Sequence, residues 1–186
     1  MKIRAHFKCP VPRAIGLKKH LLVKTAAAAL KRFKTPGLEV NLILVNEREI
    51  RKINRFFLNR TYAADVIAFN YHPGKDPGSV NPVRDTGRFA RKDGCIRPPS
   101  ETSDSHPRQG SGAFSNGVKG PKPFGDIYIC APRAKEQAAE MGHSLLTELL
   151  ILSAHGALHL AGLEDDTPKK RKLMNARTAQ LLKKLL

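Results

Sequence analysis

The chain has 186 residues, which fits one domain, and its 33 Lys and Arg against 16 Asp and Glu give a formal net charge of +17. No apolar run reaches the roughly 18 residues of a membrane span, the N-terminus lacks the apolar core of a signal peptide, and three widely spaced cysteines exclude a disulfide framework. We therefore expect a cytoplasmic protein without membrane contact. The charge favours a nucleic acid as partner, and a charge that serves solubility or reflects a ribosome-associated habitat is the alternative.

Strands and helices alternate in the first 71 residues. Apolar spacing predicts an edge strand over 2–8, a helix over 15–33, a strand over 38–45, a helix over 47–58 and a strand over 64–71. Asn46 is suited to cap the second helix, whose first turn carries acidic residues.

Residues 72–124 differ in composition, because Gly, Pro, Ser and charged residues replace the apolar periodicity. Fifty residues without regular structure are unusual inside a domain, so we interpret this segment as a disordered insertion or long surface loop. Its basic excess allows weak RNA contact, and a solvated insert without a role is the alternative. The prediction is thus a single domain over 1–186 with an insertion.

Regular structure is predicted again from Gly125. The elements are a strand over 125–130, a helix over 132–141 and a long apolar helix over 145–161 that is capped by Ser144 and ends before Gly162. A basic helix follows over 168–186, capped by Thr167 ahead of Pro168. The apolar side of the last helix is expected at Leu173, Leu181, Leu182 and Leu185. These elements predict an α+β fold, in which a small mixed sheet packs against helices.

Two histidines stand out at the end of the long apolar helix. His155 and His159 are four residues apart, so they share one helix face and can bind one metal ion. The turn at Gly162 is followed by Glu164, Asp165 and Asp166, and two histidines with one carboxylate leave a coordination position open, as in catalytic zinc sites. The alternative is a pair of hydrogen-bonded core histidines.

The distribution of charge agrees with a metal site that faces a polyanion. Residues 125–166 hold seven acidic and two basic residues, whereas residues 1–60 and 167–186 are strongly basic. Asp65 and Asp126 each lie beside a turn, where we interpret them as structural caps, although Asp65 could also line the cleft.

The segment HGALHLAGLEDD (155–166) resembles the signature of the YbeY family, H-G-x-L-H-L-x-G followed by an aromatic residue, Asp, and His or sometimes Asp. The family's metal-binding helix, with the strand and helix before it, resembles GDIYICAPRAKEQAAEMGHSLLTELLILSAHGALHL. Its T-D-V-L-S-F-P strand resembles ADVIAFN (64–70), and the helix before that strand resembles NEREIRKINRFFLNR (46–60). The resemblance covers about 38–71 and 125–166. It implies a metal-dependent endoribonuclease of ribosomal RNA maturation.

Carried over by resemblance, His155, His159 and Asp165 are the ligands of one Zn²⁺. Asp replaces the usual His at 165, and Glu164 and Asp166 stay open as alternative third ligands. Leu163 stands where the family has an aromatic residue, and Glu164 where it has Asp. The family's loop Arg aligns with Leu58, and Arg60 is the candidate to replace it as a contact to RNA phosphate. The basic run 169–172 departs from the family's usual acidic tail and suggests added RNA or ribosome affinity.

These features lead to one main hypothesis, a single-strand-specific metal-dependent endoribonuclease that processes small-subunit ribosomal RNA and serves ribosome quality control. The first alternative is a ribosome-assembly factor that binds RNA, with a structural metal and little or no catalysis. The second is a metallopeptidase or other zinc hydrolase, which the charge and Gly156, in place of the Glu of H-E-x-x-H, argue against.

Overall fold

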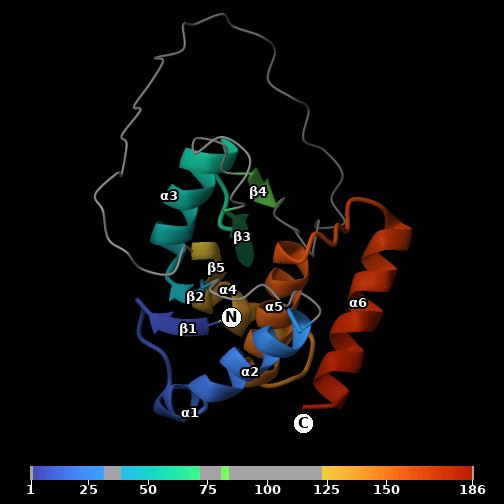
Figure 1. Ribbon diagram of the computed structural model, residues 1–186. Helices are drawn as coiled ribbons and strands as arrows, with labels where there is room; N and C mark the ends of the chain where they lie inside the picture. The colour runs from blue at the N-terminus through green and yellow to red at the C-terminus, as the bar shows by residue number, and fades with distance from the viewer. Residues whose placement is uncertain (1, 32–38, 72–80, 84–122, 186) are drawn as a thin grey trace, which may run out of the picture.

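Five strands form one mixed sheet in the computed structural model, which describes residues 2–31, 39–71, 81–83 and 123–185 (Figure 1). The order across the sheet is β1-β2-β5-β3-β4. Strands β1, β2 and β5 are parallel, whereas β3 is antiparallel to both β5 and β4. The bounds are β1 Lys2–Phe7, β2 Glu39–Val45, β3 Val66–Asn70, β4 Asn81–Val83 and β5 Pro123–Cys130.

Helices cover both faces of this sheet. Helix α3 packs on one face, and α2, α5 and α6 lie on the other, as Figure 1 shows. The helices are α1 Arg13–Leu17, α2 Lys19–Ala29, α3 Glu47–Leu58, α4 Ala131–Glu140, α5 Leu145–Leu160 and α6 Pro168–Lys183. The predicted α+β fold with a small mixed sheet is therefore confirmed.

Alternation along β3 separates two apolar clusters. Val66 and Ala68 face the larger cluster, which includes α5, whereas Ile67 and Phe69 face the cluster under α3. Successive side chains of a strand point to opposite faces, so one five-residue strand contributes to both. The sheet thus fixes where α5 and α3 lie relative to each other.

Predicted caps define the helix starts. The side chain of Asn46 accepts a hydrogen bond from the Glu49 amide of α3, and Ser144 and Thr167 do the same for α5 and α6. Each cap supplies an acceptor for a backbone N–H of the first helical turn, which would otherwise lack a hydrogen-bond partner. These three predictions are confirmed.

The structure differs from the prediction in the N-terminal region. The helix expected over 15–33 is two helices, because the backbone at Lys18, with φ −99° and ψ 15°, departs from helical geometry. Helix α2 ends at Ala29, and the predicted end at Phe33 lies outside the described residues.

Strand β4 was not expected, since it lies within the segment 72–124 for which the sequence predicts no regular structure. It is three residues long, too short for a periodic signal, and its Pro82 is typical of an edge strand. The strand β5 also begins in this segment, at Pro123. The remainder, 72–80 and 84–122, lies outside the described residues, so the predicted insertion stays a prediction there.

Helix α6 packs on a face that matches the predicted one at Leu181 and Leu182 but not at Leu173. Leu173 is 51% exposed, whereas the neighbouring Met174 is completely buried. Residues 174, 178 and 181–182 recur at helical spacing, and Met174 packs in the larger cluster with Leu181 and Leu182 at its border. The expectation for Leu173 was therefore wrong. None of the helices in the described part of the chain has the length and apolarity to cross a membrane.

Candidate metal centre

The last two turns of α5 hold both histidines. The rings of His155 and His159 are buried, with centroids 4.7 Å apart and planes at 86°. The rest of this stretch is small or aliphatic, so the helix packs against the sheet while the two imidazoles share one side. Burial of two polar rings on an apolar helix requires a polar partner.

A backbone carbonyl fixes the orientation of His159. Its Nδ1 lies 2.8 Å from the carbonyl oxygen of Leu163, and because a carbonyl only accepts, Nδ1 carries the proton. The lone pair is then on Nε2, which is buried and has no hydrogen-bond partner among the described residues. Histidines that bind a metal through one ring nitrogen usually donate a hydrogen bond from the other nitrogen, as His159 does to the carbonyl oxygen.

The turn after α5 brings Asp165 to the histidines. Gly162, with φ +82°, adopts the left-handed conformation that reverses the chain after the helix. Asp165 is buried, with Oδ2 3.7 Å from His155 Nε2 and Oδ1 4.0 Å from His159 Nε2. One ligand atom from each of the three residues lies within 4.8 Å of the others. We call these three residues the candidate metal centre.

These separations fit a single small cation. Ligands about 2.0–2.2 Å from a common zinc ion lie about 3.3–3.6 Å apart in a tetrahedron, slightly less than the 3.7 and 4.0 Å observed. Burial and the charge of His155 lower the pKa of His159 to about 4, so its ring is neutral at pH 7. Burial opposes ionisation of Asp165, but the two histidines hold its pKa below the usual value. The protonation states of His159 and Asp165 are therefore those that metal ligands need.

The neighbouring carboxylates serve another purpose. Glu164 and Asp166 both contact the ammonium of Lys170, at 2.8 and 2.9 Å, and neither belongs to the centre. Arg171 Nη2 donates to the backbone oxygen of Asp165 at 3.4 Å. The start of α6 thus holds both sides of the turn that carries Asp165, and the geometry favours Asp165 over the two alternative third ligands.

Sequence reasoning missed this anchoring. We interpreted residues 169–172 as a surface for RNA, although the spacing of Asp166 and Lys170, four apart, is the signal for a helical ion pair. The carbonyl of Leu163 could not be found from side-chain identity at all.

Two other aspartates stabilise the surroundings. Asp65 is buried at the start of β3, where its carboxylate accepts hydrogen bonds from the Gln137 amide and from its neighbour's backbone N–H. Burial raises the pKa of Asp65, although these hydrogen bonds and the charge of His155 oppose the rise. Asp126 accepts hydrogen bonds from Asn41, Tyr71 and Tyr128 within the sheet, a structural role.

Arg60 lies in the loop that joins α3 to β3. Its Nη1 donates to the Tyr62 hydroxyl at 2.8 Å, and its guanidinium carbon is 5.9 Å from the centre of that ring. The structure therefore brings Arg60 to Tyr62 and not into the group of His155, His159 and Asp165. Contact of Arg60 with RNA phosphate stays a prediction.

Close packing explains Gly156, which sequence reasoning treated only as a missing general base. A Cβ atom at this position would lie 2.5 Å from Ile127 Cγ2 and 3.3 Å from Val66 Cγ2. The absent side chain lets α5 approach β3 and β5 directly, so the histidines on either side are held at a fixed height above the sheet.

Sequence comparisons identify the family of the chain. The family model described as "Endoribonuclease YbeY" matches residues 15–186. The chain belongs to the endoribonuclease YbeY family. An endoribonuclease YbeY of Elusimicrobium minutum is 36% identical over 185 residues, all of both chains, and one of Bacillus licheniformis is 30% identical over 155 residues, 83% of this chain and 77% of the relative. The family expected from the HGALHLAGLEDD segment is thus confirmed.

The fold of this YbeY family member is also found in a solved structure. The solution structure of TM1509 from Thermotoga maritima matches with a TM-score of 0.52 over 98% of this chain and 88% of that one. At 20% identity this likeness concerns the fold alone.

Proposed function

We propose that the protein is a metal-dependent endoribonuclease that cuts single-stranded RNA during maturation of small-subunit ribosomal RNA and in ribosome quality control, in the cytoplasm. The observation that carries the proposal is the convergence of two buried histidines and one buried aspartate on one point, in a chain of the YbeY family. The relatives are named endoribonucleases, which supports RNA as the substrate and an enzyme over an assembly factor without catalysis.

His155, His159 and Asp165 would hold the metal, and two histidines with one carboxylate favour Zn²⁺. A divalent cation in this position supplies Lewis acidity toward a phosphoryl oxygen or a water molecule. Leu163 keeps the proton of His159 on Nδ1, away from the centre, and Asp165 contributes negative charge that offsets the cation. The net charge of +17 favours capture of RNA, and Arg60 is proposed to contact a phosphate.

The test compares RNA cleavage by the wild type with that by His155→Ala plus His159→Ala. Metal content and circular dichroism are measured on both, and His20→Ala, a change at an exposed helix position, is the control. We expect the wild type and the control to contain metal and to cut single-stranded RNA faster than its duplex. The folded double variant should do neither.

The choice of zinc and the proposal of RNA cleavage are tested separately. Reconstitution of metal-free protein with Zn²⁺, Mn²⁺ or Mg²⁺ identifies the ion that restores activity, and activity with Mn²⁺ but not Zn²⁺ would contradict the choice of zinc alone. RNA binding without cleavage under every metal would contradict the nuclease and return the assembly factor as the better hypothesis.

A further inference from the structure

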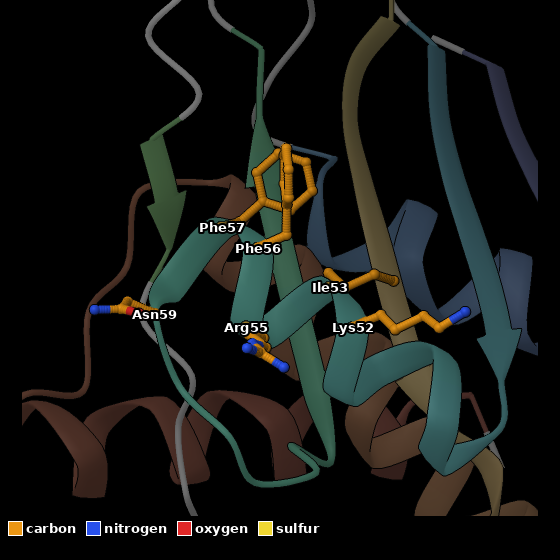
Figure 2. A pocket seen from close by; sticks show the side chains of 6 residues that line it. All are labelled: Lys52, Ile53, Arg55, Phe56, Phe57 and Asn59. Atoms are coloured by element: carbon orange, nitrogen blue, oxygen red, sulfur yellow. The ribbon is translucent and has the colours of Figure 1, made fainter. Parts of the chain in front are cut away.

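The outward face of α3 exposes a large aromatic side chain. Phe56 is 84% exposed and its neighbour Phe57 is 45% exposed. Both line a pocket of about 650 Å³, whose other described lining residues are Lys52, Ile53, Arg55 and Asn59. Figure 2 shows the rings of Phe56 and Phe57 lying together at one side of α3, with the side chains of Lys52, Arg55 and Asn59 extending from the helix in other directions. We call Lys52, Arg55, Phe56, Phe57 and Asn59 the α3 platform.

An aromatic chain holds Phe56 in place. Its ring contacts Phe57 edge to face, with centroids 4.9 Å apart, and Phe57 in turn lies 4.8 Å from Phe69 of β3. Phe69 is fully buried, so the chain begins in the core and ends in solvent. The ring of Phe56 therefore presents its faces to solvent while its neighbour anchors it to the core.

The charges beside Phe56 identify the chemistry of the ligand. Lys52 and Arg55 are exposed and form no ion pair with another described residue, in contrast to Arg51, which contacts Glu47 at 3.3 Å. Two cations that line the same pocket as an exposed ring complement a ligand with negative charges and flat apolar faces. An unpaired strand of RNA has both, in its phosphates and bases.

The platform is close in sequence to the start of β3. Leu58 ends α3, and seven peptide steps lead to Asp65, a buried residue that is hydrogen-bonded to Gln137 of α4. Seven extended residues span at most about 25 Å. A short single strand seated on α3 can therefore extend along this loop, past Arg60.

We infer that the α3 platform binds unpaired nucleotides of RNA, with a base stacked on Phe56 and phosphates held by Lys52 and Arg55. This inference rests on the proposed function for its substrate class, and it adds a binding surface outside the metal centre. It also gives a physical source for a preference for single strands, because the bases of a duplex are already stacked on one another.

The test measures binding of a fluorescent 12-nucleotide oligouridylate in EDTA, where no metal-dependent cleavage takes place. Phe56→Ala should weaken binding about tenfold, the scale of one lost base stack. Phe56→Trp should restore the affinity and Phe56→Leu should not, since only an aromatic face stacks. An abasic oligonucleotide of the same length should bind wild type and Phe56→Ala equally.

The contribution of Lys52 and Arg55 is tested by measuring how the affinity for the oligouridylate depends on salt concentration. Lys52→Ala plus Arg55→Ala should reduce the slope of log affinity against log salt by about 1.4, or about 0.7 for each phosphate that the protein no longer neutralises. Lys135→Ala plus Lys183→Ala, which removes the same charge from α4 and α6, should leave the slope unchanged.

Unchanged affinity for oligouridylate in Phe56→Ala overturns the inference, and Phe56 is then better explained as a protein contact. An equal loss with the abasic probe overturns base stacking as the cause. These results are independent of cleavage: a wild type that fails to cut RNA while Phe56→Ala binds it more weakly refutes the nuclease and supports the platform.

Discussion

The Nδ1 of His159 and the carbonyl oxygen of Leu163 are 2.8 Å apart, four residues from each other across the end of α5. The contact exists because Gly162 turns the chain back, so that the next carbonyl faces the helix it has just left. A conformation at one glycine thereby determines which nitrogen of a buried histidine is available to a metal.

Gly162→Ala should therefore weaken metal binding about 10- to 100-fold, the usual effect of losing a partner that orients a metal ligand. The left-handed conformation also costs Ala about 1–2 kcal/mol. Isothermal titration with Zn²⁺ measures the affinity, and Gly142→Ala is a matched control because Gly142 has φ +69° at the end of α4. Both variants should lose similar stability, and equal metal affinity in the two would contradict the role of Leu163.

Lys170→Ala should loosen the turn that carries Asp165, because Lys170 contacts both Glu164 and Asp166. We expect a loss of metal affinity of less than about tenfold, since exposed ion pairs are weak and screened. The difference from the wild type should shrink in high salt. Lys169→Ala removes a neighbouring charge and should leave the affinity unchanged, so a similar loss in both variants would indicate a general charge effect.

Gly156→Ala should destabilise the fold. The new methyl group meets Ile127 in a buried contact, and overpacking costs about 1–3 kcal/mol, more than the roughly 1 kcal/mol that Ala gains over Gly in a helix. Urea unfolding measures the change. Gly16→Ala in α1, where nothing lies within 4 Å, should be neutral or stabilising, and the prediction fails if Gly156→Ala behaves in the same way.

Acid should destabilise the metal-free protein through His159. Its pKa of about 4 in the folded state lies below the ordinary value of about 6.5, so the unfolded chain takes up the proton first. Stability is then complete above about pH 6.5 and is lost as the pH falls toward 4, by an amount on the order of 1–3 kcal/mol. Urea unfolding in EDTA at pH 7 and pH 5 should show this loss in the wild type and in His20→Ala. His159→Gln should show less of it, and an equal loss there would assign it to other groups.

Much of the fold could be predicted because its signals are local. Asn46, Ser144 and Thr167 cap their helices by bonds to residues three positions away, and such patterns are visible in the sequence. The break at Lys18 and the short strand β4 carry no comparable signal. The burial of Met174 in place of Leu173 depends on how α6 packs against the core, which spacing within one helix does not define.

Part of the candidate site could likewise be predicted from the sequence, and part could not. His155, His159 and the three acidic residues after Gly162 could be predicted from spacing, but the choice of Asp165 among them needed the position of Lys170. The α3 platform could not be predicted, because a phenylalanine in an amphipathic helix is usually part of the core. Only the structure shows that Phe56 points away from it.

The pairing of Asn70 with Gly125 makes the length of the connection between them a weak constraint on the fold. The chain departs from β3 and re-enters β5 at adjacent positions of the same ladder, so the intervening stretch connects two points that the sheet already holds together. Closing a longer connection costs little, about 0.6 kcal/mol for each doubling of its length. Residues added to or removed from this stretch outside β4 should therefore leave β3, β5 and the helix α5 packed on them in place.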